Sequence, residues 1–391
     1  MNGFTFSIPQ NIIFGKGSLK QLPEAAKKLN KSKALIISGP HLNKIGMVAA
    51  CRQALEEAGI RSDAFTETEG NPSTETVDRA VERYKESGAD FIVAFGGGSP
   101  LDVAKAAAVF ATYGGKITEY ERGGKVPRPV VPMIAVPTPV GTGTVATSSS
   151  VITDRSRNYK LTVSSQHLLA AYVILDPELV MSVPAKTAAA CGVDALVHAL
   201  VAYFSLAASP FSDMFAAKAL QIIGKNLRPY VANRKDPQAA EGMLMGSLFA
   251  GIAFSHARLG NVHAMSHPVS AFLDVAHGVA NAILLPAVVR YNALSDRGKY
   301  YDIYCCVAKA PVEKERFEPG MLAEELLALN KELGIPGSLS EVGAKEEMFE
   351  AMAEDAMKSG NIAINPRSTA KSDILELYRA AYRSSCGGGE A

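Results

Sequence analysis

Two short segments of the chain concentrate the side chains that most readily bind a divalent metal. Residues 260–278 contain three of the seven histidines, namely His263, His267 and His277. Upstream, Asp194 and His198 are four residues apart, a spacing that places both on one face of a helix. One carboxylate oxygen and up to four imidazole nitrogens suit a borderline ion such as iron or zinc. The sequence therefore predicts a metal site.

The pair of Asp194 and His198 also has a simpler explanation. A histidine in an apolar helix is more often a hydrogen-bonded core residue than a ligand. Asp194 lies among Ala, Leu and Val, where an unpaired carboxylate would be costly to bury. Either a metal or a plain hydrogen bond to His198 would offset that cost.

The histidine-rich segment makes the simpler explanation harder to sustain. His263 and His267 are one helical turn apart, and His277 requires a bend in the chain, for which Pro268 and Gly278 are available. Since at most four protein ligands are expected, one histidine is surplus and could relay protons. Spacing alone does not choose between His263 and His267.

The N-terminal part alternates short apolar runs with amphipathic segments, as in strands joined by helical crossovers in a parallel sheet. Beyond about residue 184, segments of helical period dominate. We therefore expect an α/β domain at 1–184 and an all-helical domain at 185–391, with a small polar tail at 383–391. Strands are expected at 34–38, 90–95, 130–136 and 171–175, and helices near 44–59, 76–87, 101–110 and 187–204.

A glycine-rich loop follows the expected strand 90–95. Residues 96–99 read Gly-Gly-Gly-Ser and lead into a helical segment, so the backbone could approach a phosphate held at a helix N-terminus. A second loop of small and hydroxyl residues, 137–144, would meet the first at the same edge of the sheet. The spacing is not Gly-x-Gly-x-x-Gly, and a tight turn without a ligand is the alternative to a dinucleotide site.

Composition excludes several classes of partner. The 391 residues carry 40 basic and 39 acidic side chains, which argues against nucleic acid or an anionic membrane as a partner. We find neither a membrane span nor a signal peptide and expect a cytoplasmic protein. The five cysteines lack Cys-x-x-Cys spacing, so neither a disulfide framework nor a thiolate metal site is indicated.

Four ordered motifs resemble those of the iron-containing, group III alcohol dehydrogenases. They lie at 96–105, 137–144, 192–199 and 263–278, and the similarity continues at 176–179 and 365–368. The resemblance implies a Rossmann-like domain, a helical domain and a divalent metal between them, the fold shared with dehydroquinate synthase. It also implies NADP or NAD as cofactor, a small primary alcohol or its aldehyde as substrate, and a homodimer or larger homo-oligomer.

The resemblance further implies roles for individual residues. Fe²⁺ or Zn²⁺ would be bound by Asp194, His198, His263 and His277. His267 would lie beside the nicotinamide as the catalytic residue. The cofactor would contact Gly39, Asn71, Gly97, Gly98, Ser99, Asp102, Thr138, Thr142, Lys160 and Leu179. Ser149 and Phe254 would border the substrate pocket.

Gly39 departs from the family pattern in a way that bears on the cofactor. The family usually has an acidic residue here, which would bind the adenosine ribose and repel a 2′-phosphate. Because that repulsion is absent, we expect NADPH to be accepted, with His41 and Lys44 as candidate positive partners.

Other departures bear on activity. Val145 and Val201 replace the family's usual glutamates, which indicates either a lost pair or a site altered for another substrate or weakened. His256 and Arg258 are bulkier and more polar than usual and would shape the pocket or bind a polar tail of the substrate. For Arg258, a solvated helix face is the alternative. The alternatives to an oxidoreductase are a dehydroquinate synthase-like lyase and a member with reduced activity and an assembly role.

Overall fold

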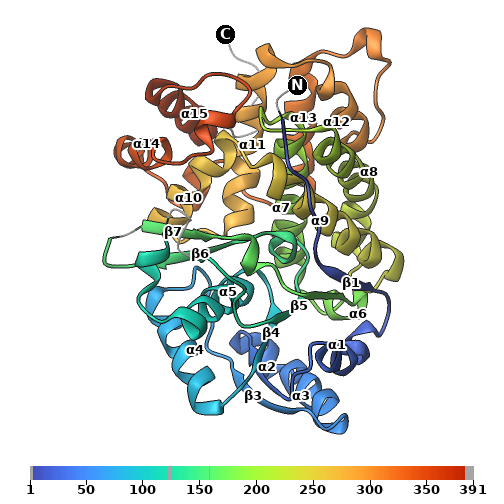
Figure 1. Cartoon of the computed structure of the whole chain (residues 1–391). Coiled ribbons are helices and arrows are strands. Elements are labelled where there is room, and N and C mark those ends of the chain that lie inside the picture. Colours follow the sequence, from blue (N-terminus) through green and yellow to red (C-terminus); the bar gives the residue numbers. More distant parts are fainter. Residues whose placement is uncertain (1–2, 122–125, 158, 384–391) are drawn as a thin grey trace. The chain divides into compact units, whose positions relative to one another are not determined.

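The computed structural model describes residues 3–121, 126–157 and 159–383 (Figure 1). The chain separates into two compact units. One is Ser7–Ser182, and the other comprises the residues from Val183 onward together with the N-terminal residues up to Phe6. Of the expected tail, Arg383 ends the last helix, and residues 384–391 lie outside the described residues.

A parallel six-stranded sheet organises the unit Ser7–Ser182. Its strand order is β1-β8-β5-β4-β2-β3, and each neighbouring pair is parallel. β4 is buried along its whole length, which explains why it reads as an unbroken apolar run in the sequence. The strands are β1 (Asn11–Phe14), β2 (Lys33–Ile37), β3 (Arg61–Phe65), β4 (Phe91–Gly96), β5 (Met133–Pro137) and β8 (Tyr172–Leu175).

The helices of this unit include one that was not expected. The helix expected near 44–59 is α3, and the short helix α2 precedes it, with Gly46 at a φ of 81° between the two. The antiparallel hairpin of β6 (Ser149–Asp154) and β7 (Tyr159–Ser164) was not expected either. The helices are α1 (Leu22–Lys28), α2 (Pro40–Lys44), α3 (Met47–Glu57), α4 (Thr74–Ser87), α5 (Gly98–Tyr113) and α6 (Pro177–Val180).

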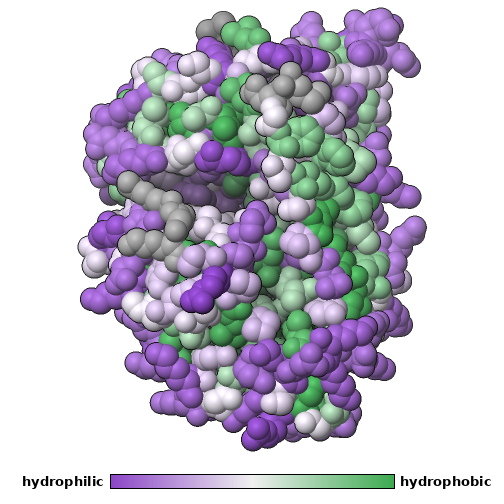
Figure 2. Space-filling model, in the orientation of Figure 1, coloured by the Kyte–Doolittle hydropathy of each residue, from purple (hydrophilic) through white to green (hydrophobic). Residues whose placement is uncertain are grey.

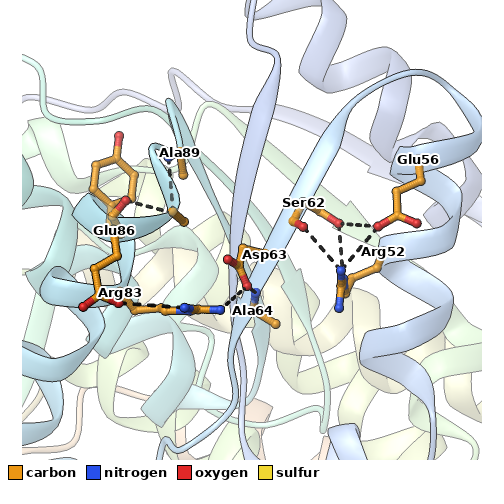
Figure 3. A network of polar contacts seen from close by, with 10 residues as sticks. Arg52, Glu56, Ser62, Asp63, Ala64, Arg83, Glu86 and Ala89 are labelled. Carbon is orange, nitrogen blue, oxygen red and sulfur yellow. Dashed lines mark hydrogen bonds and ion pairs between the residues drawn. The ribbon is translucent and has the colours of Figure 1, made fainter.

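Charged side chains flank β3, which is an edge strand of the sheet (Figure 3). Arg83 Nη2 lies 2.6 Å from Asp63 Oδ1, and Arg52 Nη2 donates to Ser62 O at 3.5 Å. Charges on an edge strand oppose pairing with another chain. They also remove the apolar run by which a strand is found in a sequence, so β3 escaped prediction.

The second unit is helical. No strand is assigned from 183 to 383, a range that the structure describes throughout, so the predicted fold class of an α/β part followed by a helical part is confirmed. Figure 1 shows the long helices of this unit. They are α7 (Ala185–Phe204), α8 (Pro210–Ala232), α9 (Pro237–Ala257), α10 (Asn261–Leu273), α11 (His277–Asn292), α12 (Lys299–Val307), α13 (Pro319–Glu332), α14 (Phe349–Met357) and α15 (Lys371–Arg383).

Helix α7 is the core helix of this unit. Contrary to the sequence-based expectation, it is long and apolar enough to cross a membrane by length and composition. However, 78 % of its most apolar window is buried inside the protein, as in the core of a globular unit. Hydrophilic residues cover much of the visible surface (Figure 2).

Candidate metal centre and nucleotide-binding loops

The structure brings together the four residues that were predicted as metal ligands. Asp194 and His198 lie one turn apart in α7, His263 lies in α10, and His277 is the first residue of α11. One donor atom of each lies within 4.8 Å of those of the other three. Asp194, His198 and His263 are between 1 and 4 % exposed. Three helices therefore converge on one mostly buried group of an oxygen and three nitrogens, in which His277 is partly exposed.

Close packing of α11 against α7 makes this convergence possible. A Cβ atom on Gly278 would lie 2.3 Å from the carbonyl oxygen of Ala190, so only glycine allows the approach. Pro268 and Gly278 were expected to provide the bend before His277, but Pro268 lies inside α10 and Gly278 inside α11. The chain turns instead at Asp274, which has a φ of 51°. A short polar residue such as Asp tolerates this left-handed conformation.

Asp194 is not satisfied by a simple pairing with His198. His198 Nδ1 lies 3.9 Å from Asp194 Oδ2, beyond hydrogen-bond distance. Asp194 Oδ1 instead accepts a hydrogen bond of 2.7 Å from Asn281 Nδ2. Asn281 was missed by the sequence reasoning, because a neutral amide gives no signal beyond its position one turn after His277.

The imidazole of His263 is in a form suited to metal binding. Burial, and then the proximity of His198, His277 and His267, lower the pKa of His263 well below its ordinary value. The ring is therefore neutral at physiological pH, with a lone pair available. Its Nδ1 is buried without a hydrogen-bond partner among the described residues.

His267 and Phe254 lie next to this group. The His267 ring centroid is 5.3 Å from that of His277 and 6.5 Å from that of His263. The Phe254 ring stacks on His198 at 4.4 Å. In contrast, the His256 ring packs against Phe6, with 4.2 Å between the ring centroids. His256 therefore does not share the contact of Phe254 with His198.

Arg258 occupies a strained turn between α9 and α10. Its φ of 61° and ψ of −167° belong to a region that is essentially restricted to glycine and costs about 1–3 kcal/mol. Its Nη2 lies 2.8 Å from the point that a Cβ atom of Gly360 would occupy. Arg258 is exposed, as the solvated interpretation expected, although it follows the end of α9 instead of lying on a helix face.

In the unit Ser7–Ser182, the two predicted loops lie at the same edge of the sheet. Gly96, at the end of β4, pairs in register with Pro137, at the end of β5. The chain connects β2 outward to β3 and β4 outward to β5 in the opposite direction, so β2 and β4 flank a topological switch point. Ligands of open α/β sheets bind at such points.

The residues that follow β2 and β4 include several predicted cofactor contacts. Gly39 is the N-cap of α2, and Gly97 is the N-cap of α5, whose first residues are Gly98 and Ser99. Thr142 packs against Gly98, because a Cβ atom there would lie 3.0 Å from Thr142 Cγ2. Close packing alone therefore explains why position 98 is glycine. The N–H groups at the start of the 16-residue helix α5 are nevertheless suited to binding a phosphate.

Other predicted cofactor residues are paired with one another. Thr138 Oγ1 donates to the carbonyl oxygen of Leu179 at 2.9 Å. Lys160 Nζ donates to Asn71 Oδ1 at 2.8 Å, and Asn71 adopts a φ of 50°. Each of these hydrogen bonds joins two predicted cofactor residues that are far apart in the sequence.

A buried lysine that the sequence reasoning did not single out secures the second loop. Lys105 Nζ donates to the carbonyl oxygens of Thr144, Thr147 and Ser149 at 2.7–2.9 Å. Burial lowers the pKa of Lys105 to about 8, and the nearby Asp102 opposes that change. Burial likewise raises the pKa of Asp102 to about 7 against the charge of Lys105.

The two valines that replace the family's glutamates are buried in separate units. Val145 is 5 % exposed, and its carbonyl oxygen accepts a hydrogen bond from Gln10. Val201 lies in α7 and is 1 % exposed. Each valine therefore packs as a core residue of its own unit.

Comparison with known families identifies two matching regions. Residues 9–177 match the family model described as iron-containing alcohol dehydrogenase, and residues 188–382 match the one described as Fe-containing alcohol dehydrogenase family, C-terminal. Together the two models cover almost the whole chain.

Individual proteins are similar over nearly their full length. A 1,3-propanediol dehydrogenase from Citrobacter freundii is 37 % identical over 97 % of this chain and 99 % of its own. A lactaldehyde reductase from Escherichia coli strain K12 is 36 % identical over 94 % of this chain and 97 % of its own. The crystal structure of a 1,3-propanediol oxidoreductase has a TM-score of 0.93 at 36 % identity, over 97 % of this chain and 100 % of its own.

Proposed function

The chain belongs to the iron-containing alcohol dehydrogenase family, and from that premise we propose that it is a metal-dependent oxidoreductase of small primary alcohols and their aldehydes. NAD or NADP would be the hydride carrier. The observation that carries the proposal is the convergence of four donors, Asp194, His198, His263 and His277, from three helices. The similarity to a propanediol dehydrogenase and a lactaldehyde reductase supports the same class. It does not favour the lyase or the assembly role.

The residues present fit a divalent metal. They offer one oxygen and three nitrogens, and they are close together and mostly buried. We propose Fe²⁺ or Zn²⁺ as the ion. When bound, the cation would polarise the substrate oxygen as a Lewis acid, and the nicotinamide would exchange the hydride with the substrate carbon.

The side chains around the group would supply position and proton transfer. His267 is half-buried beside His277, and we propose that its imidazole moves the proton between substrate oxygen and solvent. Phe254 covers one face of His198 and would border the substrate pocket. We also propose Ser149, the first residue of β6, as a residue that contacts the substrate. The cofactor contacts proposed for the loops after β2, β4 and β5 are those named above.

An assay with reduced nicotinamide tests the proposal directly. The enzyme is stripped of metal with a chelator, reloaded with Fe²⁺ or Zn²⁺, and mixed with NADH or NADPH and a panel of small aldehydes. We expect aldehyde reduction, measured as loss of the reduced-nicotinamide absorbance, to depend on the added ion. Conversion of a phosphorylated sugar acid without net consumption of cofactor would support the lyase instead.

The residue at position 39 is proposed to set the choice of cofactor. Gly39 follows β2 at the switch point and has an extended φ of −103°, so a side chain there would be compatible with the backbone. In Gly39→Asp, the carboxylate is expected to repel a 2′-phosphate and to lower kcat/KM for NADPH about tenfold or more relative to NADH, since 1.4 kcal/mol corresponds to tenfold.

Gly39→Ala is the matched control for that substitution. A Cβ atom at position 39 would lie 3.2 Å from the carbonyl oxygen of Thr68, so both variants carry the same close contact. Only the aspartate adds charge. Strict preference of the unmodified enzyme for NADH would contradict the proposal.

A homo-oligomer and a cytoplasmic location complete the proposal. Phe4 and Phe211 are in ring contact at 5.8 Å and remain 46 and 49 % exposed, and Met214 is 57 % exposed. Exposed apolar side chains that lie close together are typical of protein contacts. Light scattering of the purified protein measures the oligomeric state.

A further inference from the structure

Asn281 contacts three of the four proposed ligands through a single atom. It lies in α11, one turn after His277, and is 0 % exposed. Its Nδ2 lies 2.7 Å from Asp194 Oδ1. The same nitrogen lies 3.1 Å from His277 Nε2 and 3.2 Å from His263 Nε2. A neutral side chain thus lies within hydrogen-bond distance of an atom of each of these three residues.

The carboxylate of Asp194 determines which way this amide faces. Rotating the amide by half a turn would place the carbonyl oxygen of Asn281 against Asp194 Oδ1, and both atoms are acceptors. The nitrogen therefore faces Asp194. This orientation leaves Asn281 Oδ1 buried without a hydrogen-bond partner among the described residues. Such an unpaired oxygen is costly, so the contacts of the nitrogen must outweigh it.

The amide orientation also determines the protonation of two imidazoles. An amide nitrogen has two hydrogens to donate and accepts none. With one hydrogen on Asp194 Oδ1, the other is shared between the Nε2 atoms of His263 and His277, which are then both acceptors. The ring protons then lie on Nδ1, and the Nε2 lone pairs point into the group. This is the tautomer in which Nε2 can bind a cation.

We infer that Asn281 is a positioning residue of the metal centre. It orients the carboxylate of Asp194 and keeps His263 and His277 in the tautomer needed for binding, before any ion arrives. An ion that takes the two Nε2 lone pairs would replace the amide there, while the stronger and shorter bond to Asp194 can persist. The inference rests on the proposed metal site and adds a residue that acts through its ligands.

Substitution by leucine tests this role, since leucine has a similar volume and no donor. Zn²⁺ and Co²⁺ affinities of metal-stripped protein are measured by competition with a chelator, and the visible spectrum of the Co²⁺ form is recorded. For Asn281→Leu we expect about 10–100-fold weaker Zn²⁺ binding, the usual effect of losing a partner of a ligand. We also expect a changed Co²⁺ spectrum. Asn281→Ser, which is smaller and keeps a donor, should bind with intermediate affinity, and it provides the test if the leucine variant does not fold.

Asn292→Leu is the matched control. Asn292 is a buried asparagine of the same helix whose amide exchanges hydrogen bonds of 2.8 and 3.1 Å with Asn365. This variant should lose thermal stability yet keep the Zn²⁺ affinity and Co²⁺ spectrum of the unmodified enzyme. Unchanged or tighter Zn²⁺ binding by folded Asn281→Leu overturns the inference. If the unmodified enzyme binds neither ion, the metal site itself is wrong, and the two failures are thereby distinguished.

Discussion

Asp194→Ala is expected to lose the bound metal and, with it, turnover in both directions. Asp194 supplies the only oxygen among the four converging donor atoms and is 2 % exposed. Alanine has no atom that could bind the ion in its place. Changes to residues that merely support a ligand cost 10–100-fold in affinity or activity. Loss of the ligand itself should therefore lower Zn²⁺ affinity and kcat/KM by about 100-fold or more. Elemental analysis after dialysis measures the metal, and aldehyde reduction measures turnover.

The thermal transition separates loss of metal from loss of fold. Binding of an ion to the native state alone stabilises it by RT ln(1 + [L]/Kd), so Zn²⁺ should raise the Tm of the unmodified enzyme and leave that of Asp194→Ala unchanged. Asp213→Ala is a suitable control, because Asp213 pairs with Lys299 at 2.7 Å and lies outside the donor group. An Asp194→Ala enzyme with full metal content and normal turnover would contradict the proposed site.

The donor group could be predicted because its residues are close together within two short segments of the sequence. Asp194 and His198 share a helix face at a separation of four residues, and His263 and His277 fall within one histidine-rich segment. What spacing could not provide was the choice between His263 and His267. Both lie on α10 one turn apart, and the choice depends on how α10 is rotated against α7 and α11.

The elements that failed to be predicted lack a local signal. The edge strands β1 and β3 are partly exposed and do not form apolar runs. The bend before His277 depends on the backbone of Asp274 rather than on Pro268, which α10 accommodates within its length. Lys105 reads as an ordinary charged residue of a helix until its three carbonyl partners are known. These features are set by tertiary contacts, which a single sequence does not display.

The glycines of residues 96–98 were predicted to serve cofactor binding, but the fold itself requires at least one of them. Gly96 has a φ of 145°, and a Cβ atom there would lie 2.7 Å from Pro100 Cγ, so the turn into α5 needs glycine whether or not a ligand binds. Position at the switch point between β2 and β4 is the stronger argument for a dinucleotide. That argument depends on the strand order, which the sequence alone did not provide.

His267→Ala is expected to keep the metal and to lose most of the turnover. Its ring lies beside His277 but outside the group of four donors, so the donor set is complete without it. Proton transfer by a positioned side chain contributes about 10²–10⁴-fold to a rate, and imidazole is the side chain whose ordinary pKa lies closest to neutrality. We therefore expect kcat to fall within that range and its pH dependence near neutrality to flatten.

His256→Ala separates this role from a general effect of removing an imidazole. His256 lies at the end of the neighbouring helix α9 and packs on Phe6 at 4.2 Å, away from the donor group. The control should keep both kcat and its pH profile, while metal content stays at the unmodified level in both variants. If His267→Ala instead loses its metal while the remaining metal-bound fraction turns over normally, His267 is a ligand, and the proton must reach solvent by another route.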